Sequence, residues 1–218
     1  MSSSRSIWVL GIHRSGTSAL AGALQHLGVD MGTMGRPEIS SPDSNPVGQY
    51  EDEEGVILLN GTVGNWRIPQ KLLYNHEAND AFFEYVKRRE AASPLWGFKD
   101  PRLCFYWNMM WNMPEAPAVV YTIRDPDKIA ASIMERDKFP PFVASMLVSE
   151  YWLGLYSAIA LTVKKGIPVH GVQYPQLLKK PYTTLALMCE TIGLDPTDEQ
   201  MRDAAAHIDP TLSHHGDI

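Results

Sequence analysis

The sequence predicts an α/β fold in three layers, with a central parallel sheet flanked by helices. Short apolar runs rich in strand-forming residues alternate with longer segments whose apolar residues recur at helical spacing. Glycine, proline and other turn residues separate most of these segments. Such an alternation of strands and helices is typical of a parallel sheet that carries helices on both faces.

The first part of the chain predicts a strand, a glycine-rich turn and a helix. The apolar run 7–10 predicts a buried strand, and the apolar spacing over 18–27 predicts a helix that ends at a glycine. Residues 29–50 are rich in glycine, proline, serine and aspartate, so we expect a long loop there. Two further helices are expected over 51–61 and 77–92.

The middle of the chain predicts two strands and two helices. Residues 95–98 and 118–123 are the expected strands, and the second has the clearest strand pattern in the sequence. A helix is expected over 127–136 and a long one over 142–165. The long segment is strongly apolar, but Glu150 interrupts it, so we interpret it as a buried amphipathic helix and not as a membrane span.

The last part of the chain predicts a strand over 169–172 and helices over 176–192 and 197–207. Residues 209–218 are expected to form a loose tail. A length of 218 residues fits a single domain over 1–218.

Charge and cysteine content narrow the functional classes. Acidic residues outnumber basic ones by 25 to 19, which excludes a general nucleic-acid binder because such a protein needs a basic surface. Acids are concentrated in 37–54 and 190–218, so the rest of the chain carries net positive charge. Cys104 and Cys189 lie in apolar stretches, and we expect buried free thiols in a soluble, cytoplasmic protein.

The turn after the first strand reads Gly11-Ile12-His13-Arg14-Ser15-Gly16-Thr17-Ser18. Its two glycines and final Ser/Thr form the frame of a phosphate-binding loop, in which backbone N–H groups at a helix N-terminus hold an anion. An ATPase has Lys after the second glycine, whereas this chain has Thr17 there and its cation at Arg14. The sequence therefore predicts a P-loop NTPase-like fold whose loop binds phosphate but suits a nucleoside triphosphate with Mg²⁺ poorly.

This loop resembles the 5′-phosphosulfate loop of sulfotransferases that use 3′-phosphoadenosine 5′-phosphosulfate (PAPS) as donor. The bacterial, tyrosylprotein and Golgi types of that family often carry Arg at the position of Arg14. The resemblance implies that the 5′ side of the donor is bound by Arg14, Ser15, Gly16, Thr17 and Ser18. It also implies a reaction that needs no metal.

Two further segments resemble the family's 3′-phosphate site. Arg124 follows the clearest predicted strand, and Ser132 lies about two turns into the next predicted helix, so both side chains can face one anion. Tyr174 begins a Tyr-Pro-Gln-Leu segment similar to the family's Tyr-Glu-Asp-Leu. The resemblance implies that Arg124, Ser132 and Tyr174 hold the 3′-phosphate. An ordinary helix start at Asp125 and a core tyrosine are the structural alternatives.

The remaining matches concern the transfer itself. Lys99 lies in a Lys-Asp-Pro segment similar to that of tyrosylprotein sulfotransferases, which implies a contact with the transferring sulfonate; a surface ion pair is the alternative. The segment Asn45-Pro46-Val47-Gly48-Gln49-Tyr50-Glu51 is similar to one of bacterial relatives. Glu51 is the first candidate for a general base and Asp52 the second, with a solvated acidic helix start as the alternative.

Together the resemblance spans residues 7 to about 195 and implies sulfonate transfer from PAPS to a hydroxyl or amine, with adenosine 3′,5′-bisphosphate as product. We expect a small-molecule or carbohydrate acceptor on the variable side formed by 29–95, and a peptide acceptor stays open. Neither nucleic acid nor a membrane is expected as partner, and the oligomeric state stays open. Two alternatives stay open as well: a P-loop kinase or nucleotide-binding protein, and an inactive relative that acts as a binding module.

Overall fold

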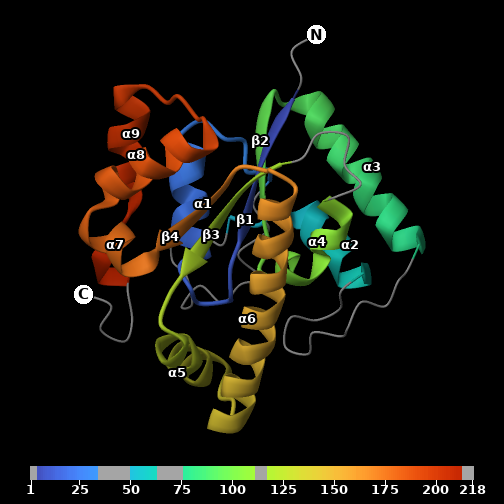
Figure 1. Cartoon of the computed structure of the whole chain (residues 1–218), viewed down its shortest axis with the longest axis vertical. Coiled ribbons are helices and arrows are strands. Elements are labelled where there is room, and N and C mark those ends of the chain that lie inside the picture. Colours follow the sequence, from blue (N-terminus) through green and yellow to red (C-terminus); the bar gives the residue numbers. More distant parts are fainter. Residues whose placement is uncertain (1–3, 34–49, 63–75, 111–116, 213–218) are drawn as a thin grey trace.

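Four parallel strands form the central layer within the residues that the structure describes, which are 4–33, 50–62, 76–110 and 117–212 (Figure 1). The structure is a computed structural model. The strands are β1 (Arg5–Leu10), β2 (Leu95–Lys99), β3 (Ala118–Ile123) and β4 (Val169–Gln173). They lie in the order β2-β1-β3-β4, and each neighbouring pair is parallel. The predicted fold class is confirmed.

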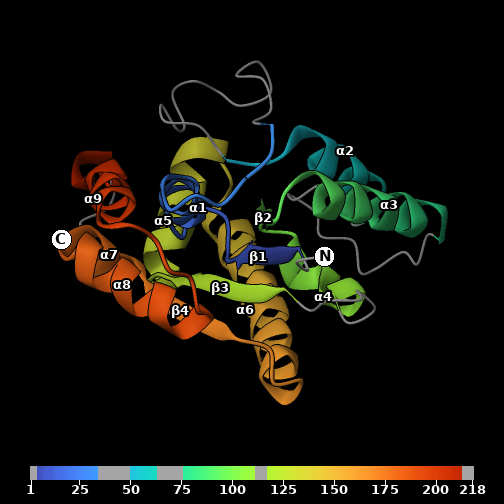
Figure 2. The ribbon, with the colours of Figure 1, turned by 90° about the horizontal axis from the view of Figure 1, so that it is seen from above.

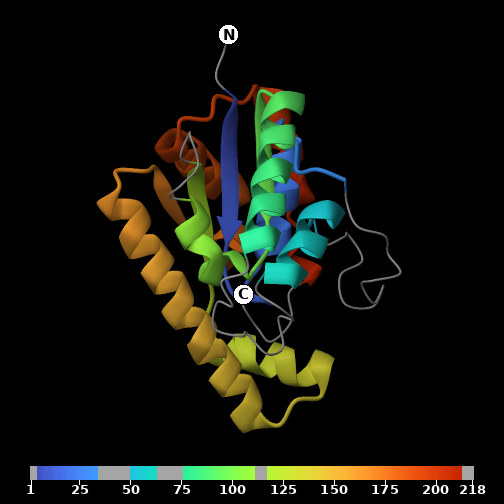
Figure 3. The same ribbon diagram turned by 90° about the vertical axis from the view of Figure 1, so that its right-hand side faces the viewer.

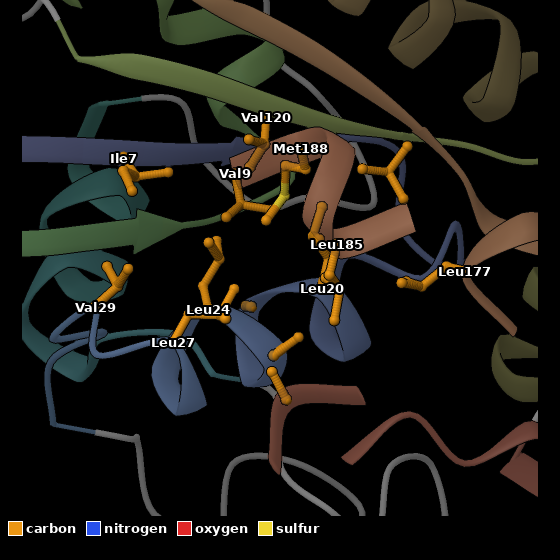
Figure 4. Packing of buried hydrophobic residues seen from close by; sticks show 14 of the residues in the cluster. Ile7, Val9, Leu20, Leu24, Leu27, Val29, Val120, Leu177, Leu185 and Met188 are labelled. Atoms are coloured by element: carbon orange, nitrogen blue, oxygen red, sulfur yellow. The ribbon is translucent and has the colours of Figure 1, made fainter. Parts of the chain in front are cut away.

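One face of the sheet is covered by helices from both ends of the chain (Figure 2). These helices are α1 (Thr17–His26), α7 (Tyr174–Lys179), α8 (Pro181–Ile192) and α9 (Asp198–His207). Ile7 and Val9 point to this face because alternate side chains of a strand lie on the same side. They pack in one apolar cluster with Leu20, Leu24, Val120, Leu185 and Met188 (Figure 4).

The opposite face carries the larger aromatic side chains. Its helices are α2 (Glu53–Thr62), α3 (His76–Ala92), α4 (Leu103–Met110), α5 (Pro126–Asp137) and α6 (Pro141–Lys164). Trp8 of β1 is fully buried there and meets the ring of Phe82 at 6.1 Å and that of Phe98 at 6.0 Å, both edge to face. Each such ring pair contributes about 0.5–1.5 kcal/mol beyond the burial of its area.

Local sequence signals explain where α5 and α9 begin. Asp125 accepts a hydrogen bond from the Asp127 N–H at 2.8 Å and caps α5, whose first residue is proline. Thr197 and Gln200 form a reciprocal capping box at the start of α9. The first of these caps also orients the turn that directly follows Arg124.

Two sequence predictions of helices are corrected. Helix α4 is not predicted because it is short and mostly apolar, and a short apolar run does not distinguish a buried helix from a buried strand. The single helix expected over 176–192 is two helices, α7 and α8, because Pro181 has no N–H for the helical ladder and so begins a new helix. The expected tail contains a short 3₁₀ turn, Pro210–Leu212, and residues 213–218 lie outside the described residues. Most of the loop expected over 29–50 also lies outside them.

Strand register brings the carboxyl ends of the strands to one level. Val9 of β1 pairs with Lys99, the last residue of β2, and Leu10 pairs with Tyr121 of β3. The segments that follow β1, β2, β3 and β4 therefore meet at one edge of the sheet, where parallel α/β folds bind ligands. Figure 3 shows α5 and the first half of α6 beyond the arrowhead of β1, on this side of the sheet.

Helix α6 is the one described helix that is long and apolar enough to cross a membrane by length and composition. One third of its most apolar window is buried inside the protein, and core helices of soluble proteins pass the same test. Ala144, Leu147, Tyr151 and Leu155 form part of its buried face. The predicted amphipathic helix is present, but it is buried along one face only.

Both cysteines are free and buried, as predicted. Burial raises the pKa of the Cys104 thiol to about 12 and that of the Cys189 thiol to about 11. Neither group is a reactive thiolate at neutral pH.

Candidate active site

The turn between β1 and α1 has the backbone of a tight anion-binding loop. Arg14 and Gly16 both have positive φ, 67° and 97° respectively. The loop closes through a hydrogen bond from the Ser15 N–H to the Ile12 carbonyl oxygen at 3.1 Å. No side chain of the described residues caps α1. Since the first N–H groups of a helix lack partners within it, this end of α1 favours an anion.

Ser15 fixes the shape of this loop from the inside. Its buried hydroxyl donates to the Ile12 carbonyl oxygen at 2.6 Å and shares a hydrogen bond of 2.6 Å with the Thr122 hydroxyl of β3. The N–H and the hydroxyl of Ser15 thus both bond within the protein, and its contact with a donor stays a prediction. Thr17 and Ser18, by contrast, form the first turn of α1.

Tyr174 lies directly against the loop backbone. A Cβ at Gly16 would overlap the carbon atoms of the Tyr174 ring, so only glycine fits the space between loop and ring. The guanidinium carbon of Arg124 lies 5.4 Å from the centre of the same ring, a distance that permits a cation–π contact. The ends of β3 and β4 therefore bring Arg124 and Tyr174 together at the loop.

Arg14 joins the loop to helix α5. Its Nε atom donates to the Ser132 hydroxyl at 2.8 Å, and its carbonyl oxygen accepts a hydrogen bond of 2.6 Å from Arg124. Arg14 thus forms one connected group with Arg124 and Ser132, although each of these two lies more than a hundred residues after it in the chain. This arrangement places two guanidinium groups and a hydroxyl where the resemblance implies an anion with two phosphates.

Lys99 and Glu51 form an ion pair beside the start of α1. The Lys99 Nζ atom lies 2.6 Å from a carboxylate oxygen of Glu51 and 3.3 Å from the Ser18 hydroxyl. The side chains of Lys99 and Glu51 are 4% and 18% exposed. Burial raises the pKa of Glu51 above its ordinary value, and the charge of Lys99 acts against this shift. The structure therefore brings together a cation and a carboxylate that takes up a proton more readily than usual.

Asp52, the second candidate base, has structural partners. Its buried carboxylate accepts hydrogen bonds from the Thr33 N–H at 3.1 Å and from the Gly55 N–H at 3.2 Å, at the start of α2. Arg89 of α3 lies 3.5 Å from it. These contacts occupy Asp52 as a helix cap and a bridge between segments, so the geometry favours Glu51 as the base.

A buried ion pair that the sequence motifs did not single out supports the end of β2. The carboxylate of Asp100 accepts hydrogen bonds of 2.9 and 2.6 Å from Nε and Nη2 of Arg102, and the same Nη2 atom also donates to the Val56 carbonyl oxygen of α2 at 3.3 Å. The pair thereby connects the turn after Lys99 to α2. Removal of one partner from such a pair costs roughly 3–5 kcal/mol because the other charge stays buried.

His13 lies at the centre of a positively charged region. Its Nε2 atom is 3.2 Å from the Tyr151 hydroxyl of α6, and the two rings meet edge to face at 5.3 Å. Its pKa is lowered well below the ordinary value, so the ring is neutral at pH 7. The causes are burial first and then the positive charges of Lys99, Arg136, Arg102 and Arg14.

Arg136 is a second residue that the motifs missed. Its charge contributes to the lowered pKa of both His13 and Arg14, for which burial is the largest cause. It lies four residues after Ser132 on α5, and residues four apart share one face of a helix. That spacing is the signal that could have identified it. Positive charges held close together in this way create a local potential that attracts an anion.

The described residues contain no group of three or more His, Cys, Asp or Glu side chains that could hold a metal ion. The site as described is instead rich in cations and N–H donors, which are ligands for anions. A metal-free reaction stays a prediction.

Replacement of Gly16 by alanine should weaken the binding of adenosine 3′,5′-bisphosphate by at least about tenfold, because the positive φ alone costs about 1–2 kcal/mol and the new methyl group would displace the Tyr174 ring. Gly166→Ala is the matched control: its φ is 69°, and no atom lies within 4 Å of the new Cβ. Calorimetric titration of both variants measures the difference. Equal affinities for the two variants would show that the Tyr174 contact does not shape the site.

Comparison with known proteins supports one family. A sequence profile of the sulfotransferase family matches residues 6–199. A search of curated protein sequences found no match.

Solved structures share the fold. The sulfotransferase STF9 from Mycobacterium avium aligns with a TM-score of 0.66 and 15% identity over 94% of this chain and 68% of its own. The sulfotransferase STF1 from Mycobacterium tuberculosis aligns with a TM-score of 0.61 and 21% identity over 93% of this chain and 71% of its own. The sulfotransferase domain of an olefin synthase from Synechococcus PCC 7002 aligns with a TM-score of 0.55 and 16% identity over 97% and 87%.

Proposed function

The chain belongs to the sulfotransferase family, and from this premise we propose that it transfers a sulfonate group from PAPS to a hydroxyl or amine of an acceptor. The observation that carries the proposal is the buried pair of Lys99 and Glu51 beside the start of α1. Such a transfer needs a cation for the moving sulfonate and a base for the acceptor proton, both next to a phosphate-binding loop.

Each part of the reaction has a candidate group. In-line transfer forms a bond between the acceptor oxygen or nitrogen and sulfur, and it breaks the bond between sulfur and the bridging oxygen of the donor's 5′-phosphate. Glu51 takes the acceptor proton, and Lys99 neutralises charge on the sulfonate oxygens. Arg14 and the first N–H groups of α1 stabilise the departing phosphate, as preorganised donors do in phosphoryl transfer.

The 3′ side of the donor is assigned to Arg124, Ser132 and Tyr174. Two observations support this assignment: Arg124 contacts the backbone of Arg14, and Ser132 contacts its side chain. A second anionic group can therefore lie beside the first. The Tyr174 ring, which lies against Gly16 and under Arg124, limits how far that group can move.

Arg124→Ala should weaken the binding of adenosine 3′,5′-bisphosphate by roughly tenfold to a hundredfold, because a charge-assisted hydrogen bond contributes about 1.5–3 kcal/mol. The affinity for adenosine 5′-phosphate should change far less, since that nucleotide lacks the 3′ group. Calorimetric titration with both nucleotides measures this difference. Arg88, an exposed residue paired with Glu54, provides the control Arg88→Ala. An equal loss of affinity for both nucleotides would show that Arg124 does not bind the 3′-phosphate.

The experiment that tests the proposed function compares PAPS with ATP as the donor. Turnover is measured with PAPS and a panel of small-molecule, carbohydrate and peptide acceptors, and binding of adenosine 3′,5′-bisphosphate is measured without Mg²⁺. Binding and turnover under these conditions support the proposal. A preference for Mg²⁺ with ATP would favour a kinase, although Thr17 replaces the lysine that a kinase loop of this type needs. Bisphosphate binding without any turnover would favour an inactive binding module.

We place this reaction in the reducing environment of the cytoplasm, with a small molecule or carbohydrate as acceptor. The two free, buried thiols support the compartment. The acid-rich segment 37–54, which contains Glu51, supports a polar or cationic acceptor.

A further inference from the structure

Helix α6 presents a long apolar surface on the side that the protein does not cover. Phe142, Leu153 and Tyr156 are 76%, 67% and 71% exposed, and Met146 and Val163 are 50% and 58% exposed. Large exposed side chains that occur singly are normal, but several along one helix mark an interaction surface.

Most exposed residues of α6 lie along one face of the helix. Seven of them, at alternating spacings of four and three, form what we call the α6 seam: Phe142, Met146, Ser149, Leu153, Tyr156, Ala160 and Val163. These spacings place the seven residues on one face of the helix, and a mainly apolar stripe that continues for three heptads can pack along another helix.

The polar groups near the seam are largely satisfied within α6. The Ser149 hydroxyl donates to the Ser145 carbonyl oxygen at 2.9 Å, and the Ser157 hydroxyl donates to the Leu153 carbonyl oxygen at 2.8 Å. Glu150 is the only charged residue from Pro141 to Val163. Burial of the seam would therefore leave few polar groups without a partner.

The seam lies on the side of α6 opposite the candidate active site. Phe142 and Ala160 are each nine residues from Tyr151, which is two and a half helical turns and so half a rotation around the helix. Tyr151 is the residue that contacts His13 of the phosphate loop. In Figure 3, α6 runs along the outer side of the molecule, away from β1. The α6 seam therefore faces away from the candidate active site.

We propose that the α6 seam is a homodimer interface in which two copies of α6 pack antiparallel about a two-fold axis at Leu153. An antiparallel arrangement about Leu153 pairs Phe142 with Val163, Met146 with Ala160, and Ser149 with Tyr156. Each pair joins a larger side chain to a smaller one, so the same seam fits itself. A two-fold axis requires this self-complementarity.

The exposed area fits such an interface. The large apolar side chains of the seam expose roughly 600 Å² of surface per copy, since one aromatic side chain alone covers about 150–250 Å². These side chains are Phe142, Met146, Leu153, Tyr156 and Val163. Two copies would then bury about 1,200 Å² in total, the lower limit for a specific stable interface. We accordingly expect a dimer that dissociates on dilution.

Sedimentation and light scattering of the full chain test this proposal through the molecular mass. The expected result is a mass twice that of the chain at micromolar concentration. Leu153→Glu should raise the dissociation constant by roughly a hundredfold or more, because it places two like charges on the axis. Leu187→Glu on α8 is the matched control, since Leu187 is 56% exposed and lies on another face. Thermal unfolding of both variants checks that each is folded.

Cysteine crosslinking tests the orientation independently of stability. Oxidation should join two copies of Leu153→Cys rapidly and should not join two copies of Phe142→Cys, since only the first position meets itself in an antiparallel pair. Because the two native thiols are buried, the wild type should not crosslink and serves as the negative control. Equal crosslinking at both positions would indicate a parallel pair and overturn the proposal. A monomer, or a monomer that sediments with phosphatidylcholine vesicles, would overturn it as well. None of these measurements depends on sulfotransferase activity.

Discussion

Arg14→Ala should lower kcat for sulfonate transfer by about a thousandfold or more. The side chain lies at the turn of the phosphate loop, bonds to Ser132 and is surrounded by groups that also attract anions. A cation that stabilises the transferring or departing group contributes about 10³–10⁵ in phosphoryl transfer, and a single hydrogen-bond donor contributes about 10²–10³. Single-turnover kinetics with saturating PAPS measure this loss directly.

Two controls separate charge from geometry in this experiment. Arg14→Lys keeps the positive charge but cannot reproduce the planar guanidinium contact with Ser132, so its rate should fall between those of the wild type and the alanine variant. Arg88→Ala removes an exposed cation from α3 and should leave kcat unchanged. Full activity in Arg14→Ala would contradict the assignment of the phosphate loop.

Glu51→Gln should reduce kcat by about 10²–10⁴-fold and leave the affinity for adenosine 3′,5′-bisphosphate nearly unchanged. The amide keeps an oxygen that can accept the Lys99 hydrogen bond, but it cannot take the acceptor proton. Rapid-quench measurement of the chemical step, together with calorimetric titration of the bisphosphate, separates these two effects. An unaltered rate of the chemical step would show that another residue acts as the base.

Asp52→Asn distinguishes the two candidate bases. Since Asp52 caps α2 and contacts Arg89, this variant should unfold at a lower temperature. Its chemical step should change much less than that of Glu51→Gln. The reverse pattern, a stable protein that transfers slowly, would assign the base to Asp52.

The pH dependence of turnover provides a further check on Glu51. A base must be deprotonated to act, and burial raises the pKa of Glu51 above its ordinary value. Activity should therefore fall, as the pH is lowered, at a higher pH than it would for an exposed glutamate. In Glu51→Gln this acid limb should be absent from the residual rate. A limb that persists unchanged in that variant would belong to another group.

The sequence predicted β1 and β3 well because each contains a short apolar run bounded by turn residues, as in 118–123 and β3. Arg14, Lys99, Arg124 and Tyr174 each lie at or just after the end of a strand, and their roles in the site stay predictions. Parallel strands then place these ends along one edge.

What the sequence could not predict depends on packing between distant elements. The contact of His13 with Tyr151 joins residues 138 positions apart, and no local pattern indicates it. Asp100 and Arg102 lie only two positions apart in the sequence, but their role in the fold follows only from the contact of Arg102 with the Val56 carbonyl oxygen of α2. Helix α4 was missed for a different reason: it has only eight residues and is mostly apolar, so its sequence also fits a buried strand.

The packing of α9 on α1 has a consequence for how the protein is made. The ring of His207, at the end of α9, lies 4.9 Å from that of His26, at the end of α1. Helix α1 therefore acquires this cover only after about 180 further residues have been synthesised. Tyr174, the partner of Gly16 in the phosphate loop, is likewise synthesised more than 150 residues after that loop. Until then the side of α1 that packs on α9 stays exposed, and exposed apolar surface of this kind makes a partly folded chain prone to aggregation.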